Sequence, residues 1–202
     1  MNIIIESVKK IEKILEHSGC AEGDVLLDVN PEARNCQFEK GACMTASFGG
    51  RIADFVTYDP IRARTRISFM YGAPLDTSST RGAAAAIVNV VMGFFCLVRV
   101  LHACPESAHM PCLAELKQEI GGRRLFCVGT MPAIEREFAG LLVDNPESAD
   151  IILINGDGIT LTGTGDLVEQ YIGSDRVLCI GSSVTGVARL HEVRHWCPYG
   201  RS

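Results

Sequence analysis

The first helix predicted by the hydrophobic pattern lies near the start of the chain. Its apolar positions recur at steps of three and four residues: Ile4, Val8, Ile11 and Leu15. This spacing places them on one face of an amphipathic helix, with lysines and glutamates on the other face. Gly19 follows as a residue suited to end it.

Strand-like runs follow at residues 24–30 and 42–58. Gly49 and Gly50 interrupt the second run, and because glycine tolerates positive φ they predict a tight hairpin there. Residues 64–72 continue the strand pattern. The N-terminal part therefore has an α+β character.

A long apolar segment without charges, residues 82–98, lies between Arg81 and Arg99. It is about as short as a spanning helix can be. Its alanines, glycines and Asn89 favour a helix buried against protein, running to about His102. The candidate N-caps are Ser78, Ser79 and Thr80.

From about residue 120 the pattern alternates between apolar strands and short helices. A helix at 111–120 precedes this part, with Gly121-Gly122 after its end. The predicted strands are 123–129, 149–156 and 175–181, and the predicted helices are 132–142, 164–173 and 187–196. Buried strands separated by helices are typical of βαβ units.

The predicted fold class is thus α/β, with a Rossmann-like parallel sheet in the C-terminal half. We expect an N-terminal α+β region at residues 1–120, with the hairpin and the alanine-rich helix, and a βαβαβα unit at residues 121–202. The two parts can also form one continuous domain, because the N-terminal strands can extend the same sheet.

Composition narrows the classes of function. The chain has 202 residues and a net charge of -5, which argues against a general nucleic-acid binder because such proteins need a basic surface. Nine cysteines without a preceding signal peptide predict a cytoplasmic protein with reduced thiols. Three of these cysteines lie in apolar runs and are expected in the core: Cys96, Cys127 and Cys179.

A ligand site is predicted at the loops that follow the three strands. Ligands of open α/β sheets bind outside the carboxyl ends of the strands. The residues predicted to contact a small anionic ligand or nucleotide-like cofactor are Gly129, Asp157, Gly181, Ser182, Ser183 and Thr185. Hydroxyls and free helix N–H groups suit a phosphate or a carboxylate. The alternative is that these residues only cap helices and form turns, and the loops lack a G-x-G-x-x-G motif and a P-loop lysine.

Two clusters of histidine and cysteine predict a transition-metal site as an alternative. The first comprises His102, Cys104, His109 and Cys112, and the second comprises His191, His195 and Cys197. Imidazole and thiolate suit zinc and softer metals. The spacings are not those of zinc ribbons or fingers. Two alternatives therefore remain open: the first cluster is only a polar connecting loop, and the second only lies on the surface of the last helix. The two clusters can also join in space.

The C-terminal half resembles a known family. The segments that carry the resemblance are RGAAAAIVN, LFCVGTMPAI, ADIILINGDGIT and VLCIGSSVTGVARL, within about residues 80–190. They are similar to the Rossmann-like domain of uncharacterised prokaryotic proteins labelled a heavy-metal chelation family. The resemblance implies a Rossmann-like sheet and is compatible with metal binding, but fold alone does not convey function.

Three hypotheses of function follow. The first is a protein that binds a small-molecule ligand at the post-strand loops, with no nucleic-acid or membrane partner. The second is a metal-binding protein that uses the cysteine and histidine clusters. The third is a homo-oligomeric interaction protein in which the helix at residues 82–98 forms the interface. The catalytic residues stay unknown, because no nucleophile and base can be paired from sequence proximity.

Overall fold

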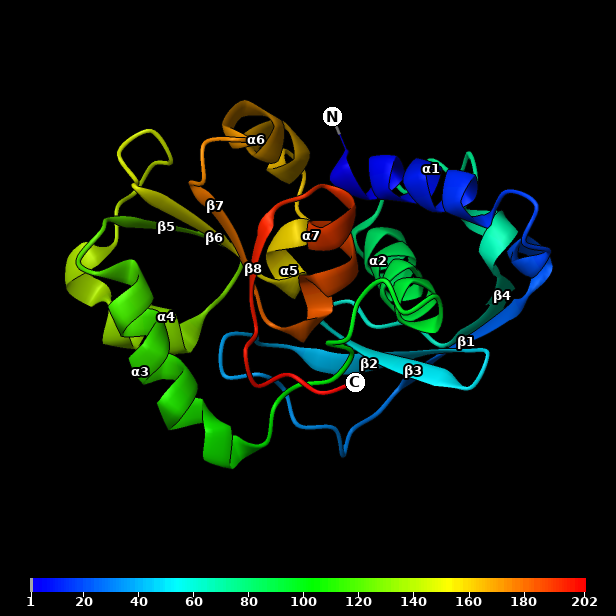
Figure 1. The fold of residues 1–202 in the computed structure, drawn as a ribbon, viewed down its shortest axis with the longest axis horizontal. Coiled ribbons are helices and arrows are strands. Elements are labelled where there is room, and N and C mark those ends of the chain that lie inside the picture. Colours follow the sequence, from blue (N-terminus) through cyan, green and yellow to red (C-terminus); the bar gives the residue numbers. More distant parts are fainter. Residues whose placement is uncertain (1) are drawn as a thin grey trace.

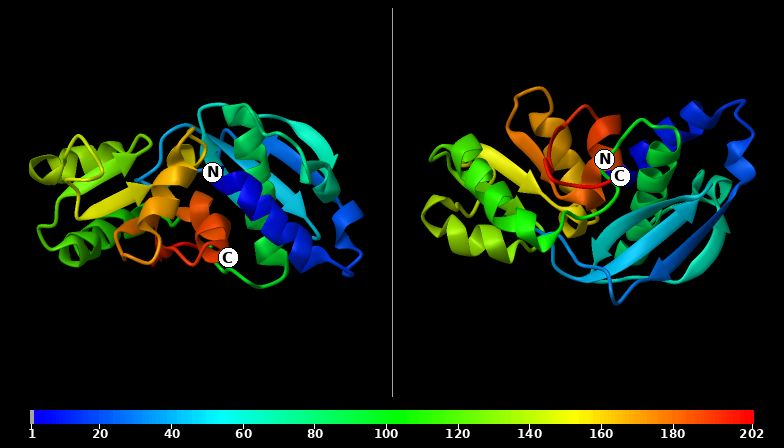
Figure 2. Two further views of the ribbon diagram at one scale, coloured as in Figure 1. Left: turned by 90° about the horizontal axis from the view of Figure 1, so that it is seen from above. Right: turned by 60° about the horizontal axis from the view of Figure 1, so that its bottom comes forward.

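The computed structural model describes residues 2–202 and contains two four-stranded sheets. The N-terminal sheet is antiparallel with strand order β3-β2-β1-β4, and the C-terminal sheet is parallel with order β5-β6-β7-β8. Figures 1 and 2 show the two sheets side by side, with helix α2 packed against the antiparallel one. The mixed α/β class and the parallel C-terminal sheet confirm the fold prediction.

The antiparallel part follows the sequence pattern closely. Its elements are α1 (Ile3–Leu15), β1 (Asp24–Val29), β2 (Ala42–Phe48), β3 (Arg51–Thr57) and β4 (Ala63–Arg66). Gly49 and Gly50 form the predicted hairpin with φ values of 55° and 79°. The strand pattern stops earlier than predicted, because residues Ile67–Met70 form a 3-10 turn after β4.

Helix α2 (Ser78–Phe94) differs from the prediction at both ends. Its N-cap is Thr77, whose hydroxyl accepts a hydrogen bond from Thr80 N at 3.2 Å. The helix ends at Phe94 and not near His102, because the chain turns back so that the Leu101 side chain packs against Gly93.

The apolar surface of α2 lies inside the molecule. Residues 82–93 are all buried, between the antiparallel sheet, α1 and α7 (Thr185–Leu190). Within the described residues 2–202, we find no helix with the length and apolar character needed to span a bilayer. Val91, at the centre of this stretch, is fully buried within the chain, so the helix offers no free face for the oligomer interface of the third hypothesis.

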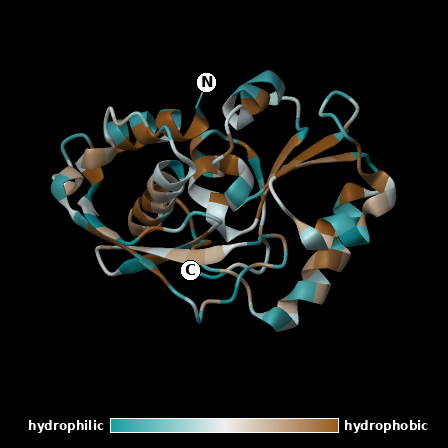
Figure 3. Cartoon of the chain, turned by 180° about the vertical axis from the view of Figure 1, so that it is seen from behind, coloured by the Kyte–Doolittle hydropathy of each residue, from teal (hydrophilic) through white to brown (hydrophobic). Residues whose placement is uncertain are grey.

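The parallel half alternates strands and helices as predicted. The strands are β5 (Leu125–Val128), β6 (Ile151–Ile154), β7 (Val177–Ile180) and β8 (Arg194–Trp196), and the helices α3 (His109–Ile120), α4 (Pro132–Glu137), α5 (Gly156–Ile159) and α6 (Thr164–Tyr171). Every residue of β6 and β7 is buried. Figure 3 shows these strands as hydrophobic along their length, which explains the continuous apolar runs.

The last predicted helix, residues 187–196, is wrong in its second half. Helix α7 stops at Leu190, and residues Arg194–Trp196 form the parallel strand β8 beside β7. Glu192 takes a φ of 55°, and Val193 N donates to Ala188 O at 2.9 Å, which closes the helix end. The fourth strand was therefore missed from the sequence.

Two apolar clusters hold the sheets and helices together. The larger one joins α1, α2 and the inner face of the antiparallel sheet to one face of the parallel sheet, so it draws on residues from both sides of residue 120. The smaller one lies between the other face of the parallel sheet and helices α3 and α4. The parallel sheet is thus covered on both faces.

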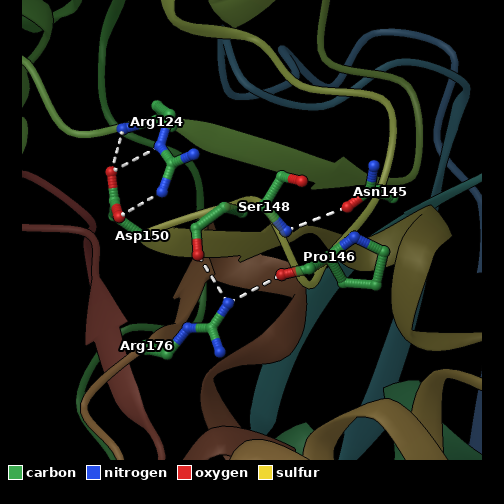
Figure 4. Close-up of polar contacts among 7 residues, drawn as sticks. Arg124, Asn145, Pro146, Ser148, Asp150 and Arg176 are labelled. Carbon is green, nitrogen blue, oxygen red and sulfur yellow. Dashed lines mark hydrogen bonds and ion pairs between the residues drawn. The ribbon is translucent and has the colours of Figure 1, made fainter.

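Polar contacts fasten the amino ends of the parallel strands (Figure 4). Arg124, just before β5, pairs with Asp150, just before β6, at 3.1 Å between Nη2 and Oδ1. Hydrogen bonds from Arg124 lower the pKa of Asp150 to about 2. Arg176, just before β7, donates to Pro146 O at 2.7 Å. The amino edge of the parallel sheet is therefore occupied by structural pairs.

Candidate functional site

The predicted ligand residues at the carboxyl edge are buried. Ser182, Ser183 and Thr185 are 1%, 0% and 5% exposed. The Ser183 hydroxyl accepts a hydrogen bond from Val56 N at 2.9 Å, and Ser183 O accepts one from Asn89 Nδ2 at 2.6 Å. Strand β3 and helix α2 therefore pack against the loop after β7.

Gly129 and Gly181 have φ values of 93° and 92°, which favour glycine. A Cβ on Gly129 would meet Asn155 Oδ1 at 2.1 Å, and one on Gly181 would meet Glu39 Cδ at 2.9 Å. Both glycines thus permit close packing of protein on protein. Asp157 is half-buried, and burial raises its pKa.

A segment from the N-terminal half closes this edge of the sheet. The loop between β1 and β2 reaches across to it, as Figure 1 shows in blue. Asn155 Nδ2 donates to Phe38 O at 3.1 Å and to Thr130 O at 2.9 Å. The loop therefore lies where a ligand of a Rossmann-like sheet would otherwise bind.

Glu39 belongs to this segment, and no pattern in the sequence singles it out. Its side chain lies against Gly156 and Gly181 and is 6% exposed. Burial raises the pKa of Glu39 to about 7, against the opposite effect of the Ser183 hydroxyl and nearby backbone N–H groups. Those groups lie near the carboxylate, but neither carboxylate oxygen has a hydrogen bond of good geometry. Burial therefore makes the neutral form of Glu39 far more accessible than that of an exposed glutamate.

An open cleft of about 610 Å³ lies on the outer face of the antiparallel sheet. Its walls are the outer faces of β2 and β3, the loop at residues 30–34, the segment at 102–105 and Arg201. This volume is within the range of small-molecule sites. His102 and Cys104, which were selected from the sequence, both line this cleft.

His102 is held in one orientation inside the cleft. Its Nδ1 lies 3.1 Å from Asp54 Oδ2, and its backbone exchanges hydrogen bonds of 2.9 and 3.0 Å with Arg201. Asp54 N in turn donates to Leu101 O at 2.8 Å. A proton on Nδ1 facing the carboxylate leaves Nε2 as the acceptor. Nε2 has no hydrogen-bond partner among residues 2–202.

Asp54 was missed at the sequence level, although a signal for it exists. It is the only acid in the apolar run IADFV of β3. Its side chain lies on the outer face of the sheet, where the returning segment after α2 brings His102 to it.

A hollow of similar size, about 690 Å³, runs along helix α1. Lysine and glutamate side chains line it, and two of them, Lys9 and Glu6, form an exposed ion pair of 2.8 Å. It contains none of the ligand or metal residues selected from the sequence. We therefore regard the cleft at His102 as the better candidate site.

The histidines of the two predicted metal clusters do not come together. His191 Nε2 lies 3.0 Å from Ser7 Oγ, and burial, with Lys10 nearby, lowers the pKa of His191 to about 4. His195 Nε2 lies 2.7 Å from Gly181 O, and burial lowers the pKa of His195. Across residues 2–202, no three His, Cys, Asp or Glu side chains are placed to hold one metal ion.

The cysteines of both clusters are mostly withdrawn from solvent. Cys104 and Cys112 of the first cluster are buried, as is Cys36, and Cys197 of the second cluster is half-buried. Burial raises the pKa of Cys197 to about 12. Outside this group, Cys179 is 1% exposed, as predicted for a core residue, and Cys127 is half-buried. The prediction for Cys96 is wrong, because it is exposed in the turn after α2 with a φ of 56°.

No protein-family model, no curated protein and no solved structure matches the chain. The resemblance to the heavy-metal chelation family stays a prediction. The candidate site is therefore defined by its own geometry.

Proposed function

We propose that this protein binds a small anionic molecule in the cleft on the outer face of the antiparallel sheet. The observation that carries the proposal is His102, whose ring is fixed by Asp54 at 3.1 Å while Nε2 is left without a partner. The ligand class is the one expected for the post-strand loops, but the structure places those loops in the interior. The reducing cytoplasm predicted from the cysteines is the proposed setting.

Two arginines supply positive charge to the cleft. Arg201 donates from Nε to Ala103 O at 3.1 Å, which fixes the base of its guanidinium group. Arg34 lies at the rim and pairs with Glu106 at 2.9 Å. A guanidinium group binds carboxylate and phosphate through a planar pair of N–H groups. These contacts favour a ligand with one of those anionic groups.

Other residues that line the cleft indicate which groups the ligand carries besides its anionic group. Glu32 and the hydroxyl of Thr45 line the same cleft, and His102 Nε2 offers a hydrogen-bond acceptor. Acceptors of this kind bind hydroxyl or amino groups. We therefore propose a small hydroxy or amino compound that carries a carboxylate or phosphate. A phosphate-bearing molecule, as expected from the sequence, is one member of this class.

The proposal can be tested by binding measurements with a panel of small hydroxy and amino acids and sugar phosphates. Calorimetry should detect binding to the wild type, and Arg201→Gln should weaken it at least about tenfold, because a hydrogen bond to a charged group is lost. Asp54→Asn should also weaken binding, because it releases the ring of His102.

Arg64 provides the matched control. It lies on the exposed β4 and pairs with Asp24 at 3.7 Å, outside the cleft. Arg64→Gln removes the same charge from the same sheet and should leave binding unchanged. Absence of binding to the wild type across the panel, or equal losses in both arginine variants, would contradict the proposal.

A further inference from the structure

His102 and Arg201, which are far apart in the sequence, are direct neighbours across a short antiparallel bridge. His102 N donates to Arg201 O at 2.9 Å, and Arg201 N donates to His102 O at 3.0 Å. The side chains of two residues paired in this way leave the backbone on the same side, with Cβ atoms about 5 Å apart. Both residues line the cleft. The bridge therefore places an imidazole and a guanidinium group next to each other in the cleft.

Asp54 on strand β3 contacts the same imidazole ring. Its Oδ2 lies 3.1 Å from His102 Nδ1, and its backbone N donates to Leu101 O at 2.8 Å. The side chain of Asp54 is 13% exposed, whereas that of His102 is 29% exposed. The carboxylate is thus more shielded from water than the ring, and the ring stays accessible from the cleft.

The contact with Asp54 prepares the ring to accept a proton. A carboxylate at one ring nitrogen fixes the orientation of the imidazole and stabilises the imidazolium that forms when the other nitrogen is protonated. His102 Nε2 has no hydrogen-bond partner among residues 2–202. An oriented ring nitrogen that water can reach has the properties of a general base.

The guanidinium group of Arg201 can stabilise negative charge that develops beside the ring. Its Nε donates to Ala103 O at 3.1 Å, which leaves the terminal N–H groups for a bound molecule. Within the described part of the chain, residues 2–202, Arg201 forms no ion pair with an acidic side chain. Preorganised N–H donors at an oxygen that gains charge contribute strongly to the catalysis of acyl transfer.

We infer that the cleft hydrolyses a small lactone to the corresponding hydroxy acid, with His102 as the general base and Arg201 as the group that stabilises the oxyanion. The inference rests on the proposed function, because a hydroxy acid belongs to the ligand class proposed for the same cleft. Hydrolysis of a lactone, unlike that of an open ester, gives a single molecule with a hydroxyl group for His102 and a carboxylate for Arg201. Asp54 is a positioning residue that acts through His102.

The reaction needs only water as a second reactant. The oxygen of a water molecule bonds to the carbonyl carbon while one proton of that water passes to His102 Nε2. The electron pair of the carbonyl double bond moves to its oxygen, and the resulting oxyanion lies beside Arg201. The carbonyl bond then forms again as the bond to the ring oxygen breaks, and the ring oxygen takes the proton from Nε2. The carboxylic acid finally releases its own proton to solvent.

Water, and not the thiol of Cys104, is the nucleophile in this reaction. Cys104 also lines the cleft, but burial raises the pKa of its thiol, against an opposite effect of Arg201. A raised pKa leaves less of the thiolate, which is the reactive form. We therefore expect no covalent adduct on the chain during turnover.

The test uses the full chain with γ-butyrolactone, δ-valerolactone and homoserine lactone as probes. Release of acid at neutral pH is followed by titration, and the spontaneous rate of hydrolysis is subtracted. The wild type should hydrolyse at least one of these lactones. Mass spectrometry of the chain, quenched during turnover, should give the mass of the unmodified protein.

Variants separate catalysis from binding. In His102→Gln the side chain keeps a hydrogen-bond acceptor but cannot take up a proton, so kcat should fall about a hundredfold or more. Binding of the free hydroxy acid to this variant, measured by calorimetry, should be largely kept. Asp54→Asn should lower kcat by a similar factor, because the ring loses the group that orients it. His17→Gln is the matched control, since His17 is exposed just after α1 and does not line the cleft.

Three results would overturn the inference. These are no hydrolysis of any probe by a wild type that unfolds cooperatively, an unchanged kcat in His102→Gln, and an adduct on Cys104 during turnover. Calorimetry with hydroxy acids reports on the proposed function alone. Binding without hydrolysis would therefore overturn the inference and leave the proposed function intact, whereas the absence of both would contradict both.

Discussion

Asn89 in helix α2 and Ser183 in the loop after β7 are joined by a hydrogen bond of 2.6 Å between Asn89 Nδ2 and Ser183 O. The other atom of the same amide, Oδ1, accepts from Gly186 N at 2.8 Å. Asn89 is fully buried, in a helix that is otherwise apolar at its centre. One side chain therefore joins the carboxyl edge of the parallel sheet to helix α2, which packs against the antiparallel sheet.

We expect Asn89→Leu to lower the free energy of unfolding by about 3 kcal/mol, because it leaves two buried backbone groups without partners. The measurement is urea denaturation, in which the midpoint should fall without a change in the slope. Asn145 is exposed, and its Oδ1 accepts a hydrogen bond from Ser148 N at 2.9 Å, which Figure 4 shows. Asn145→Ala should have a much smaller effect, and similar losses in both variants would refute the role of Asn89.

The packing of Glu39 on the carboxyl edge predicts a strict need for glycine at position 156. A Cβ there would lie 2.6 Å from Ser183 Cβ and 2.9 Å from Glu39 Oε1. Gly156→Ala should therefore destabilise the protein by about 2 kcal/mol through overpacking. Gly140 has open space around its Cβ position and an ordinary φ, so Gly140→Ala should be neutral or slightly stabilising. Thermal unfolding of both variants tests whether the carboxyl edge is crowded at Gly156, as the structure has it.

The burial of His191 predicts a loss of stability in mild acid. Its pKa is lowered to about 4, whereas an unfolded histidine titrates near 6.5. The folded protein therefore keeps the ring neutral, and its contribution to stability is full above pH ~6.5 and is lost as the pH falls towards 4. The upper limit of this contribution is about 3 kcal/mol.

The check is urea denaturation of the wild type and His191→Gln at several pH values between 7 and 4. Glutamine retains a polar group near Ser7 but does not titrate. The difference in stability between the two proteins should change in favour of the variant as the pH falls. A constant difference would show that His191 is not the residue responsible.

The exposure of the cysteines predicts the order in which they react with an alkylating reagent. Cys96 is exposed, whereas Cys36 and Cys112 are each 4% exposed. Because thiol modification needs access as well as thiolate, Cys96 should be modified first in the metal-free native protein. Mass spectrometry of digested samples gives the order. Early modification of Cys36 or Cys112 would show that the structure around these buried thiols opens in solution.

The sequence was sufficient to predict the parallel sheet because its strands are apolar throughout. Runs such as IILI in β6 can be stable only when both faces are covered, and the intervening helices provide that cover. Strand β8 was missed because His191 and His195 also satisfy helical spacing. The turn at Glu192, with its positive φ, ends helix α7 and so allows residues 194–196 to form strand β8.

The candidate site was only partly predictable, because its members come from distant segments. His102 and Cys104 were found as neighbours in the sequence, but their relation to Asp54 depends on how the chain returns after α2. The general rule for ligands of open α/β sheets pointed to the carboxyl edge of the parallel sheet, but Glu39 and its segment occupy that edge.

The hydrogen bond from Arg201 to Ala103 joins residues that are 98 positions apart. During synthesis on a ribosome, His102 and its segment emerge long before the stretch that holds them in place. The antiparallel hairpin can pair early because its contacts are local, whereas the cleft cannot form until Arg201 has been added to the chain. Binding of a ligand in the cleft would therefore follow the folding of the hairpin.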